Sequence, residues 1–217
     1  MTNRAEDMRH WNIGYFFCLA AVVIALSLAV SGQAQSDPWL ILTNGEAGSI
    51  NCHTTREDLV RLYGTANVVD QEVDVGEGDV ESVTIVFPNV PQRSIEISWK
   101  DPSKKTIPER ARIWGKASRW HAAHGISLGT SLTELNRLNG RPFVVGGFGT
   151  DEPGWITSWR GGSLEELETP GGRGVVLQLD YTVPRGMRVT LSDVNGDSHR
   201  AVIQKLNFRV REISWMF

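Results

Sequence analysis

The chain has 217 residues, of which 41% are apolar, and a formal net charge of −3 at pH 7. This composition excludes collagen-like and intrinsically disordered proteins and predicts a globular chain with one substantial core or two small coupled ones. Because Lys, Arg, Asp and Glu are interspersed along the chain instead of forming blocks, we expect no nucleic-acid partner.

The first predicted element is an export segment, because residues 13–30 (IGYFFCLAAVVIALSLAV) form the only long apolar run. Its strictly apolar part, residues 16–30, would extend about 22 Å as a helix, whereas a bilayer core is roughly 30 Å thick. Gly32 and Ala34 then supply small residues at the positions that a signal peptidase reads, which favours cleavage after Ala34. Acidic residues before the run weaken its positive flank, so a retained anchor is the alternative.

We therefore interpret residues 1–34 as a signal peptide or membrane anchor. The protein is expected in the periplasm or secreted, or else anchored in the inner membrane, with membrane contact only through residues 13–30. Cys18 lies inside the apolar run and is not placed like the acylated cysteine of a lipoprotein. After cleavage Cys52 is the remaining thiol, which allows no intrachain disulfide and favours a buried apolar cysteine over a thiolate paired with His53.

Two short helices are predicted from segments that share a pattern, residues 49–64 (SINCHTTREDLVRLYG) and 126–140 (ISLGTSLTELNRLNG). Each has a Thr/Ser pair suited to N-capping, an early acidic residue, leucines three apart and a terminal Gly. In the first helix Leu59 and Leu62 should face the core. Eight of fifteen aligned positions agree in identity or type, which indicates a duplication.

Strands are predicted after each helix and at the end of each half of the chain. NVVDQEV and PFVVGGF follow the helices as extended runs, and SVTIVF and SIEISW flank a hairpin turn. Residues 93–99 (RSIEISW) and 209–215 (RVREISW) alternate apolar and polar side chains, which predicts half-buried strands with Trp99 and Trp215 in the core. These two segments are 116 positions apart, against 76 for the helices, so an insertion is expected near residues 161–199.

The insertion is predicted to add strands and turns. VVLQLDY alternates like a strand, and Asn195-Gly196 favours a tight hairpin turn. The chain is therefore predicted to be α+β, built from two repeated helix-then-antiparallel-sheet units. Residues 35–110 form the first unit, and residues 111–217 form the second, with its strand-rich insertion near 161–199.

The repeated pattern of a small residue, two Thr/Ser residues, an acidic residue, Leu and Gly, followed by a meander of strands, resembles the repeat of the β-lactamase-inhibitory-protein-like fold. It is also similar to the single unit of small outer-membrane assembly lipoproteins of the SmpA/OmlA type. The resemblance covers roughly residues 48–100 and 125–217, without a lipobox or the disulfides of the inhibitors. It implies a fold of tandem helix-and-sheet units in an exported bacterial protein and no residue-level role.

A serine hydrolase is the enzymatic alternative. GISLG (125–129) fits the G-x-S-x-G pattern, and Asp180 or Asp193 and then His199 follow in the chain order of α/β-hydrolases. A buried strand before Ser127 and a Gly-rich oxyanion loop are missing from the sequence. The aligned position of the first copy is an asparagine, so the preferred interpretation of Ser127 is a structural one, as part of a helix-entry motif.

No metal or cofactor is predicted. His121 and His124 have a helical spacing, but the glutamate of zinc-enzyme motifs is missing between them. Asp193, Asn195 and Asp197 match the first ligand positions of a calcium loop, yet the glycine and the bidentate acid that complete such a loop are missing. GGFG and GGRG lack the strand and helix that flank a phosphate-binding loop, so they are interpreted as turns.

The chain contains eight tryptophans. Trp155 and Trp159, four apart in a strand-like stretch, are expected on one sheet face, and if that face is open they would form an aromatic platform for a protein partner. We therefore predict a non-enzymatic cell-envelope protein that binds a partner protein in the envelope or has a structural role. The alternative is a small exported serine hydrolase that uses Ser127 and His199.

Overall fold

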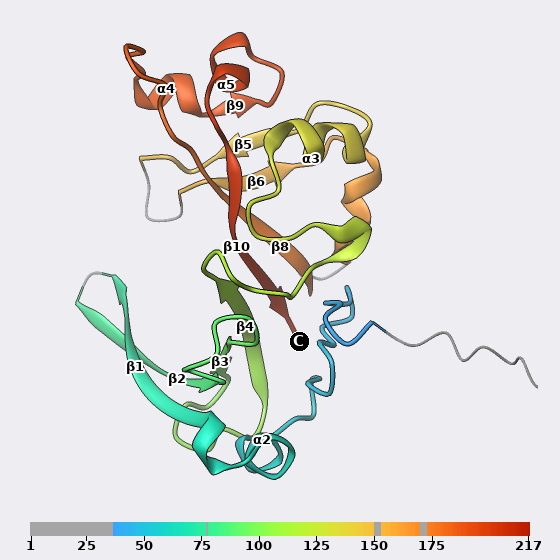
Figure 1. The fold of residues 1–217 in the computed structure, drawn as a ribbon, viewed down its shortest axis with the longest axis vertical. Coiled ribbons are helices and arrows are strands. Elements are labelled where there is room, and N and C mark those ends of the chain that lie inside the picture. The colour runs from blue at the N-terminus through green and yellow to red at the C-terminus, as the bar shows by residue number, and fades with distance from the viewer. Residues whose placement is uncertain (1–36, 77, 150–152, 170–172) are drawn as a thin grey trace, which may run out of the picture. The chain divides into compact units, whose positions relative to one another are not determined.

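A computed structural model describes four ranges of the chain, residues 37–76, 78–149, 153–169 and 173–217 (Figure 1). The predicted export segment, with its apolar run at residues 13–30, lies outside these ranges. Within them, no helix is long and apolar enough to cross a membrane.

Ten strands form one antiparallel sheet among the described residues (Figure 1). Nine of them are neighbours in the order β1-β2-β3-β4-β10-β8-β6-β5-β9, and β7 pairs with β8. The last strand in the sequence, β10, therefore lies in the middle of the sheet. The strands are β1 (Val68–Gly76), β2 (Asp79–Val86), β3 (Ile95–Trp99), β4 (Pro108–Trp114), β5 (Val144–Gly146), β6 (Trp155–Ser158), β7 (Glu168–Thr169), β8 (Arg173–Asp180), β9 (Gly196–Asp197) and β10 (Arg209–Met216).

The predicted α+β architecture of two repeated helix-then-sheet units is wrong. β10 pairs on one side with β4, where Trp215 lies opposite Ala111, and on the other side with β8, where it lies opposite Val175. Two separate sheets would leave unpaired backbone groups along the edges of β4 and β10, and the pairing of these two strands removes both edges. The predicted boundary between residues 110 and 111 falls inside β4, a strand that the sequence pattern did not predict.

Helices are short in the described ranges, and the longest, α2 and α3, have eight residues each. This small helical content also differs from the predicted α+β fold, in which each half of the sheet follows a helix. The helices are α2 (Arg56–Tyr63), α3 (Leu132–Asn139), α4 (Leu191–Val194) and α5 (Ala201–Lys205), together with the 3₁₀ turns η1 (Thr65–Asn67), η2 (Ala123–Gly125) and η3 (Ser163–Leu167).

Both predicted helices are confirmed as local elements, and they begin with the same turn. Before α2, the backbone N–H of Asn51 donates to Thr54 Oγ1 at 2.9 Å. Before α3, the backbone N–H of Ser127 donates to Thr130 Oγ1 at 3.0 Å. Short polar side chains that accept from the nearby backbone favour such turns over a continuing strand or helix. Ser127 therefore lies in a helix-entry turn.

Local capping sets the start of α2. Thr55 Oγ1 accepts from the Asp58 N–H at 3.1 Å, and the Asp58 carboxylate accepts from the Thr55 N–H at 3.0 Å, which is a reciprocal capping box. Leu59 is fully buried as predicted, whereas Leu62 is 51% exposed and the prediction for it is wrong. Because a helix has 3.6 residues per turn, Tyr63 takes the next core-facing position instead.

The core face of the sheet carries Trp99 and Trp215, which are 1% and 0% exposed, as predicted. The indole Nε1 of Trp99 donates to Thr84 Oγ1 at 2.9 Å, so the buried ring has its polar partner. The predicted half-burial of β3 is wrong, because all five of its residues are buried, Glu96 included. On the other face, the Arg112 side chain pairs with Glu96 and helps to cover it.

The region near residues 161–199 contains β8, as predicted from VVLQLDY. The prediction of a hairpin turn at Asn195-Gly196 is wrong, because Asn195 ends α4 and Gly196 begins β9. The Asn195 side-chain amide donates to Leu191 O at 2.9 Å and to Phe148 O at 3.0 Å, and its oxygen accepts from the Phe148 N–H. This amide therefore joins α4 to the connection between β5 and β6.

Candidate functional site

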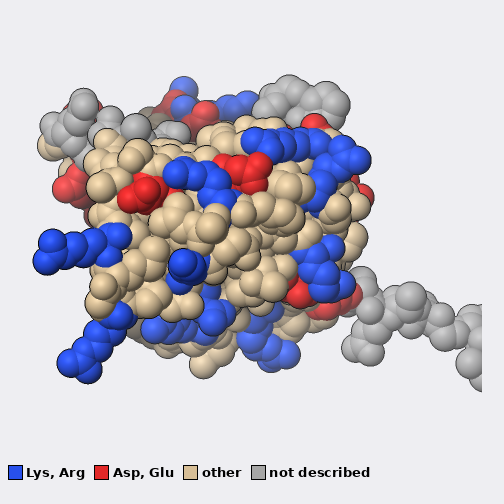
Figure 2. All heavy atoms as spheres, turned by 90° about the horizontal axis from the view of Figure 1, so that it is seen from above, with Lys and Arg blue, Asp and Glu red and all other residues tan. Residues whose placement is uncertain are grey.

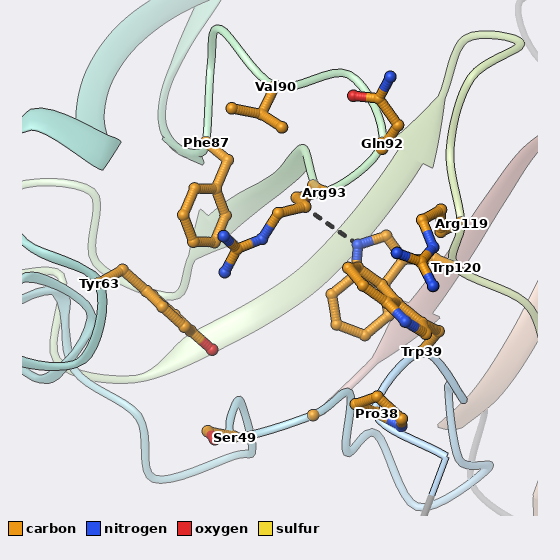
Figure 3. Close-up of a pocket in the computed structure, with 11 residues that line it drawn as sticks. Pro38, Trp39, Ser49, Tyr63, Phe87, Val90, Gln92, Arg93, Arg119 and Trp120 are labelled. Carbon is orange, nitrogen blue, oxygen red and sulfur yellow. Dashed lines mark hydrogen bonds between the residues drawn. The ribbon is translucent and has the colours of Figure 1, made fainter.

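A pocket of about 570 Å³ lies between four stretches of the chain that are far apart in sequence (Figure 3). Its volume is in the range of sites that bind small molecules. We call it the aromatic pocket, because two pairs of aromatic rings form its walls. Its residues come from the stretch 38–49, from Tyr63 at the end of α2, from the stretch 87–93 after β2, and from Arg119 and Trp120 after β4.

Hydrogen bonds between distant residues hold these stretches against one another. The N–H of Ile41 donates to His121 O at 2.8 Å, and the N–H of His121 donates to Trp39 O at 3.0 Å. The indole Nε1 of Trp120 donates to Arg93 O at 3.1 Å, which joins the stretch after β2 to the stretch after β4. The pocket is therefore fixed by the fold and not by a single loop.

The walls of the aromatic pocket are two edge-to-face ring pairs. The ring centroids of Trp39 and Trp120 are 5.3 Å apart, and those of Tyr63 and Phe87 are 5.1 Å apart. Figure 3 shows the two pairs on opposite sides of the pocket. Phe87 has a backbone φ of 58°, a left-handed conformation that costs a bulky residue on the order of 1–3 kcal/mol. The surrounding structure maintains this strain, and strain of this kind clusters at ligand sites.

Two arginine side chains accompany the rings, one on each wall. The guanidinium carbon of Arg93 is 3.6 Å from the centroid of Phe87, and that of Arg119 is 4.4 Å from the centroid of Trp39. Both side chains are exposed. Neither guanidinium forms an ion pair or a hydrogen bond with a residue in the described ranges. Their N–H groups therefore point to solvent or to a ligand, while their flat faces are held by the rings.

Tyr63 adds a neutral hydroxyl to the same wall as Arg93. Burial raises the pKa of Tyr63 above its ordinary value, and a hydrogen bond with Ser49 and the positive charge of Arg93 oppose this only in part. Since the unperturbed pKa of tyrosine is about 10, the hydroxyl is protonated at neutral pH and can donate. In Figure 3 it points toward Ser49, at the lower edge of the pocket.

Gly48 allows the backbone to pass close to the ring of Trp120 at the base of the pocket. A Cβ at this position would lie 3.3 Å from Cη2 of Trp120, and its φ of +60° is unfavourable for other residues. The residues that line the pocket include no Asp, Glu, His or Cys. It therefore combines positive charge with apolar ring surface, and it has no side chain that exchanges a proton near neutral pH.

Charged side chains elsewhere on the surface are mixed. On the face in Figure 2, Lys and Arg side chains lie among uncharged residues and carboxylates instead of forming one block. A larger hollow of about 700 Å³ carries Lys116, Arg209 and Arg211, but Asp180 lies among them. The aromatic pocket differs from this hollow because no carboxylate lines it.

The structure does not bring together the residues of the hydrolase alternative. Ser127 lies in the entry turn of α3, and His199 is exposed in the connection between β9 and α5. Within the described ranges, no hydrogen bond joins the hydroxyl of Ser127 to a histidine. Asp193 accepts from the N–H of Thr190 at the start of α4, and Asp180 accepts from the N–H of the residue that follows it. The four side chains thus take part in separate local structures.

The histidines that were considered as metal ligands also lie in separate contacts. His121 Nε2 is 2.9 Å from Asp37 Oδ2, and its Nδ1 is 3.1 Å from Ala122 O. His124 pairs with Glu166. Nowhere in the described part of the chain do three or more His, Cys, Asp or Glu side chains gather in a group that could hold a metal ion.

The structure also shows the surroundings of two loop features, Cys52 and the calcium-like sequence DVNGD. Cys52 is exposed in the turn before α2, so its predicted burial is wrong. The side chains of the calcium-like sequence DVNGD diverge: Asp193 caps α4, Asn195 binds backbone groups and Asp197 pairs with Arg160. Their oxygens are satisfied within the chain.

Trp155 and Trp159 do not form a shared exposed face. Trp159 is 3% exposed and packs on Phe143, with ring centroids 5.2 Å apart. Trp155 is half-buried in β6, and its indole N–H has no hydrogen-bond partner among the described residues. Residues four apart share a face only while the strand continues, and β6 ends at Ser158.

The sequence prediction missed the aromatic pocket. Its residues have no regular spacing, and its walls depend on contacts between the stretches 38–49, 87–93 and 119–120. The available signal was the tryptophan content of the chain, which indicated an aromatic surface without locating it. The dipeptide Arg119-Trp120 did not indicate the pocket either, because Arg119 packs on Trp39 and Trp120 donates to Arg93, both far away in the sequence.

No family model, no curated protein and no solved structure matches the chain.

Proposed function

We propose that the protein is a non-catalytic binding protein of the cell envelope, and that an anionic and partly apolar group of a partner protein enters the aromatic pocket. The observation that carries this proposal is the pair of guanidinium groups of Arg93 and Arg119, which lie against rings and form no ion pair or hydrogen bond with a residue in the described ranges. A charged group without a partner in its own chain can still form a strong, charge-assisted hydrogen bond with a ligand.

The chemistry of the pocket supports binding over catalysis. Its lining offers rings, two cations and the hydroxyls of Ser49 and Tyr63, but no histidine, carboxylate or thiol that could act as a general base or as an activated nucleophile. Arginine and aromatic residues are the types that contribute most binding energy at protein interfaces. Both kinds of residue are concentrated here.

The cellular place of this activity is part of the proposal. The apolar run at residues 13–30 and the small residues that follow it favour export to the periplasm or beyond, or retention at the inner membrane. A partner is therefore sought in the envelope.

Site-specific photo-crosslinking in the cell that makes the protein tests the proposal. A benzoylphenylalanine residue in place of Gln92, which lines the pocket, should give a crosslinked product with one envelope protein of defined mass. The matched control is the same probe in place of Leu191, which is 59% exposed and does not line the pocket. The product should also disappear when Arg93 is changed to Gln. Equal products from both positions, or no product from position 92, would contradict a binding role for the pocket.

A further inference from the structure

We infer that the aromatic pocket recognises the carboxyl-terminal residue of a partner polypeptide, when that residue has an aromatic or large apolar side chain. The inference rests on the proposed binding function and specifies the group that is bound. It follows from three features of the pocket: unused guanidinium donors, apolar walls and a neutral hydroxyl pair.

The unused donors point to a carboxylate. A guanidinium carries five N–H donors in a planar fork, and that fork matches the two oxygens of a carboxylate. The ring of Phe87 covers one flat face of Arg93, at 3.6 Å, and leaves the edge with its donors free. The chain itself contains this arrangement in a completed form: Arg112 lies 5.3 Å from the ring of Trp114 and pairs with Glu96.

The apolar walls distinguish a chain terminus from an acidic side chain. Beside Arg93, the ligand would contact the rings of Tyr63 and Phe87, and across the pocket those of Trp39 and Trp120. An Asp or Glu side chain brings a charge but little apolar surface to such walls. A carboxyl-terminal residue carries its charge and its side chain on the same α-carbon, so both can be accommodated at once.

The hydroxyls of Ser49 and Tyr63 complete the recognition of a peptide. Both lie at the lower edge of the pocket in Figure 3, on the side where Arg93 lies against Phe87. A protonated tyrosine can donate to the second carboxylate oxygen or to the last peptide carbonyl, and the serine hydroxyl can accept from the peptide N–H. A free aromatic acid has a carboxylate and a ring but no peptide group, which separates the two sources of this chemistry.

Titration calorimetry on the full chain tests the inference with four small probes. N-acetylphenylalanine carries the carboxylate, the ring and one amide, and it should bind. Its amide, N-acetylphenylalaninamide, differs only in the charge, and N-acetylalanine differs only in the ring. Each should bind at least tenfold more weakly. Phenylacetate, which has no peptide group, should also bind at least tenfold more weakly.

Two variants locate the effect. Arg93→Gln should abolish the preference for N-acetylphenylalanine over its amide, and Arg188→Gln, an exposed arginine outside the pocket, should preserve it. Near-ultraviolet circular dichroism checks that each variant is folded. If Arg93→Gln does not fold, Arg93→Lys serves instead, because it keeps the charge, loses the planar fork and should reduce the preference at least threefold.

The possible outcomes separate the inference from the function on which it rests. If the acid and the amide bind equally, recognition of a carboxylate is overturned while the crosslinking result still decides the binding role. If phenylacetate binds as tightly as N-acetylphenylalanine, the ligand is a free aromatic acid and the polypeptide terminus is overturned. If none of the probes binds although position 92 crosslinks to a partner, the pocket binds another group and the inference fails alone.

Discussion

Two arginines of this chain lie against aromatic rings, and their surroundings differ in one respect. Arg112, in the middle of the sheet, is 5.3 Å from Trp114 and pairs with Glu96 and, at 3.5 Å, with Glu212. Arg93, in the aromatic pocket, has its ring but no carboxylate within the described ranges. The first positive charge is neutralised inside the molecule, and the second forms no ion pair among the described residues.

This difference separates a charge that stabilises the fold from the one that we propose to bind a ligand. Burial lowers the pKa of Arg112, but its hydrogen bond with Glu96 and the negative charges of Glu96, Glu212 and Glu81 more than compensate, so the pKa is raised above its ordinary value. A charge that is paired in this way stabilises the folded state, and a ligand could bind it only by displacing its carboxylate partners. Arg93 has no such partner, so a ligand does not have to displace one.

The largest expected effect is the loss of stability when Arg112, the paired arginine, is replaced. Arg112→Met removes the partner of Glu96, a carboxylate that is only 3% exposed, and should lower the free energy of unfolding by about 3 kcal/mol. Urea unfolding followed by fluorescence measures this change. This loss is at the low end of the range for a buried ion pair because the Arg112 side chain is 28% exposed.

Arg110→Met is the matched control for this substitution. Arg110 lies in the same strand and pairs with Glu81 at 3.9 Å, but the two side chains are 33% and 25% exposed. Its loss should lower the free energy of unfolding by less than about 1 kcal/mol, as for other surface pairs. Equal losses for the two variants would mean that the burial of Glu96 does not decide the value of its partner.

A smaller effect is expected when Arg93 is given a carboxylate in its own chain, as Arg112 has in the sheet. Gln92→Glu adds a carboxylate to the lining of the pocket, at the position before Arg93 in the sequence, with almost no change of shape. The free energy of unfolding should change by no more than about 0.5 kcal/mol. The affinity for N-acetylphenylalanine should fall about tenfold, which corresponds to about 1.4 kcal/mol. Gln71→Glu, an exposed position in β1, is the control, and a similar loss there would point to long-range charge instead of competition at Arg93.

The smallest expected effect is a local loosening in acid. Asp37 accepts from the backbone N–H of Trp39 at 2.9 Å and from His121, and these bonds, with the charges of His121 and Arg119, hold the pKa of Asp37 below its ordinary value. A lowered carboxyl pKa contributes stability above the unfolded value of 3.8, which is lost as the pH falls through the folded pKa. The indole N–H signal of Trp39 should therefore shift as the pH falls below about 4, where the carboxyl of Asp37 takes up its proton.

Asp37→Asn provides the control for this titration. The variant cannot change its charge, so the shift of the Trp39 signal below pH 4 should vanish. Trp99, which is 1% exposed and bonded to Thr84, supplies an internal reference whose signal should not follow the titration. A shift of the Trp39 signal in Asp37→Asn with the same midpoint would show that another group controls this wall of the pocket.

The predictable parts of this molecule are those that depend on neighbours in sequence. The start of α2 follows from the capping box of Thr55 and Asp58, which involves residues three apart. The burial of Trp99 and Trp215 follows from the alternation of apolar residues within single strands. In each case the deciding contact lies within one segment of the sequence.

The architecture was not predictable in this way, because it depends on pairing between distant strands. The alternation in RVREISW is the same whether β10 forms an edge or a central strand, and no local pattern indicates that its partner is β4, about a hundred residues earlier. Trp159 was misplaced because β6 ends one residue before it. The aromatic pocket was missed for the same reason as the sheet order: Trp39 and Trp120 meet only through non-local contacts.

The central place of β10 also affects the order in which the chain can fold. Strands β1–β4 are synthesised about a hundred residues before β10, which at 5–20 residues per second is a delay of roughly 5–20 s. During that time the free edge of β4 has no native neighbour, and the later strands cannot join the sheet. A shortened β10 would therefore affect assembly of the whole sheet, and not only of its last strand.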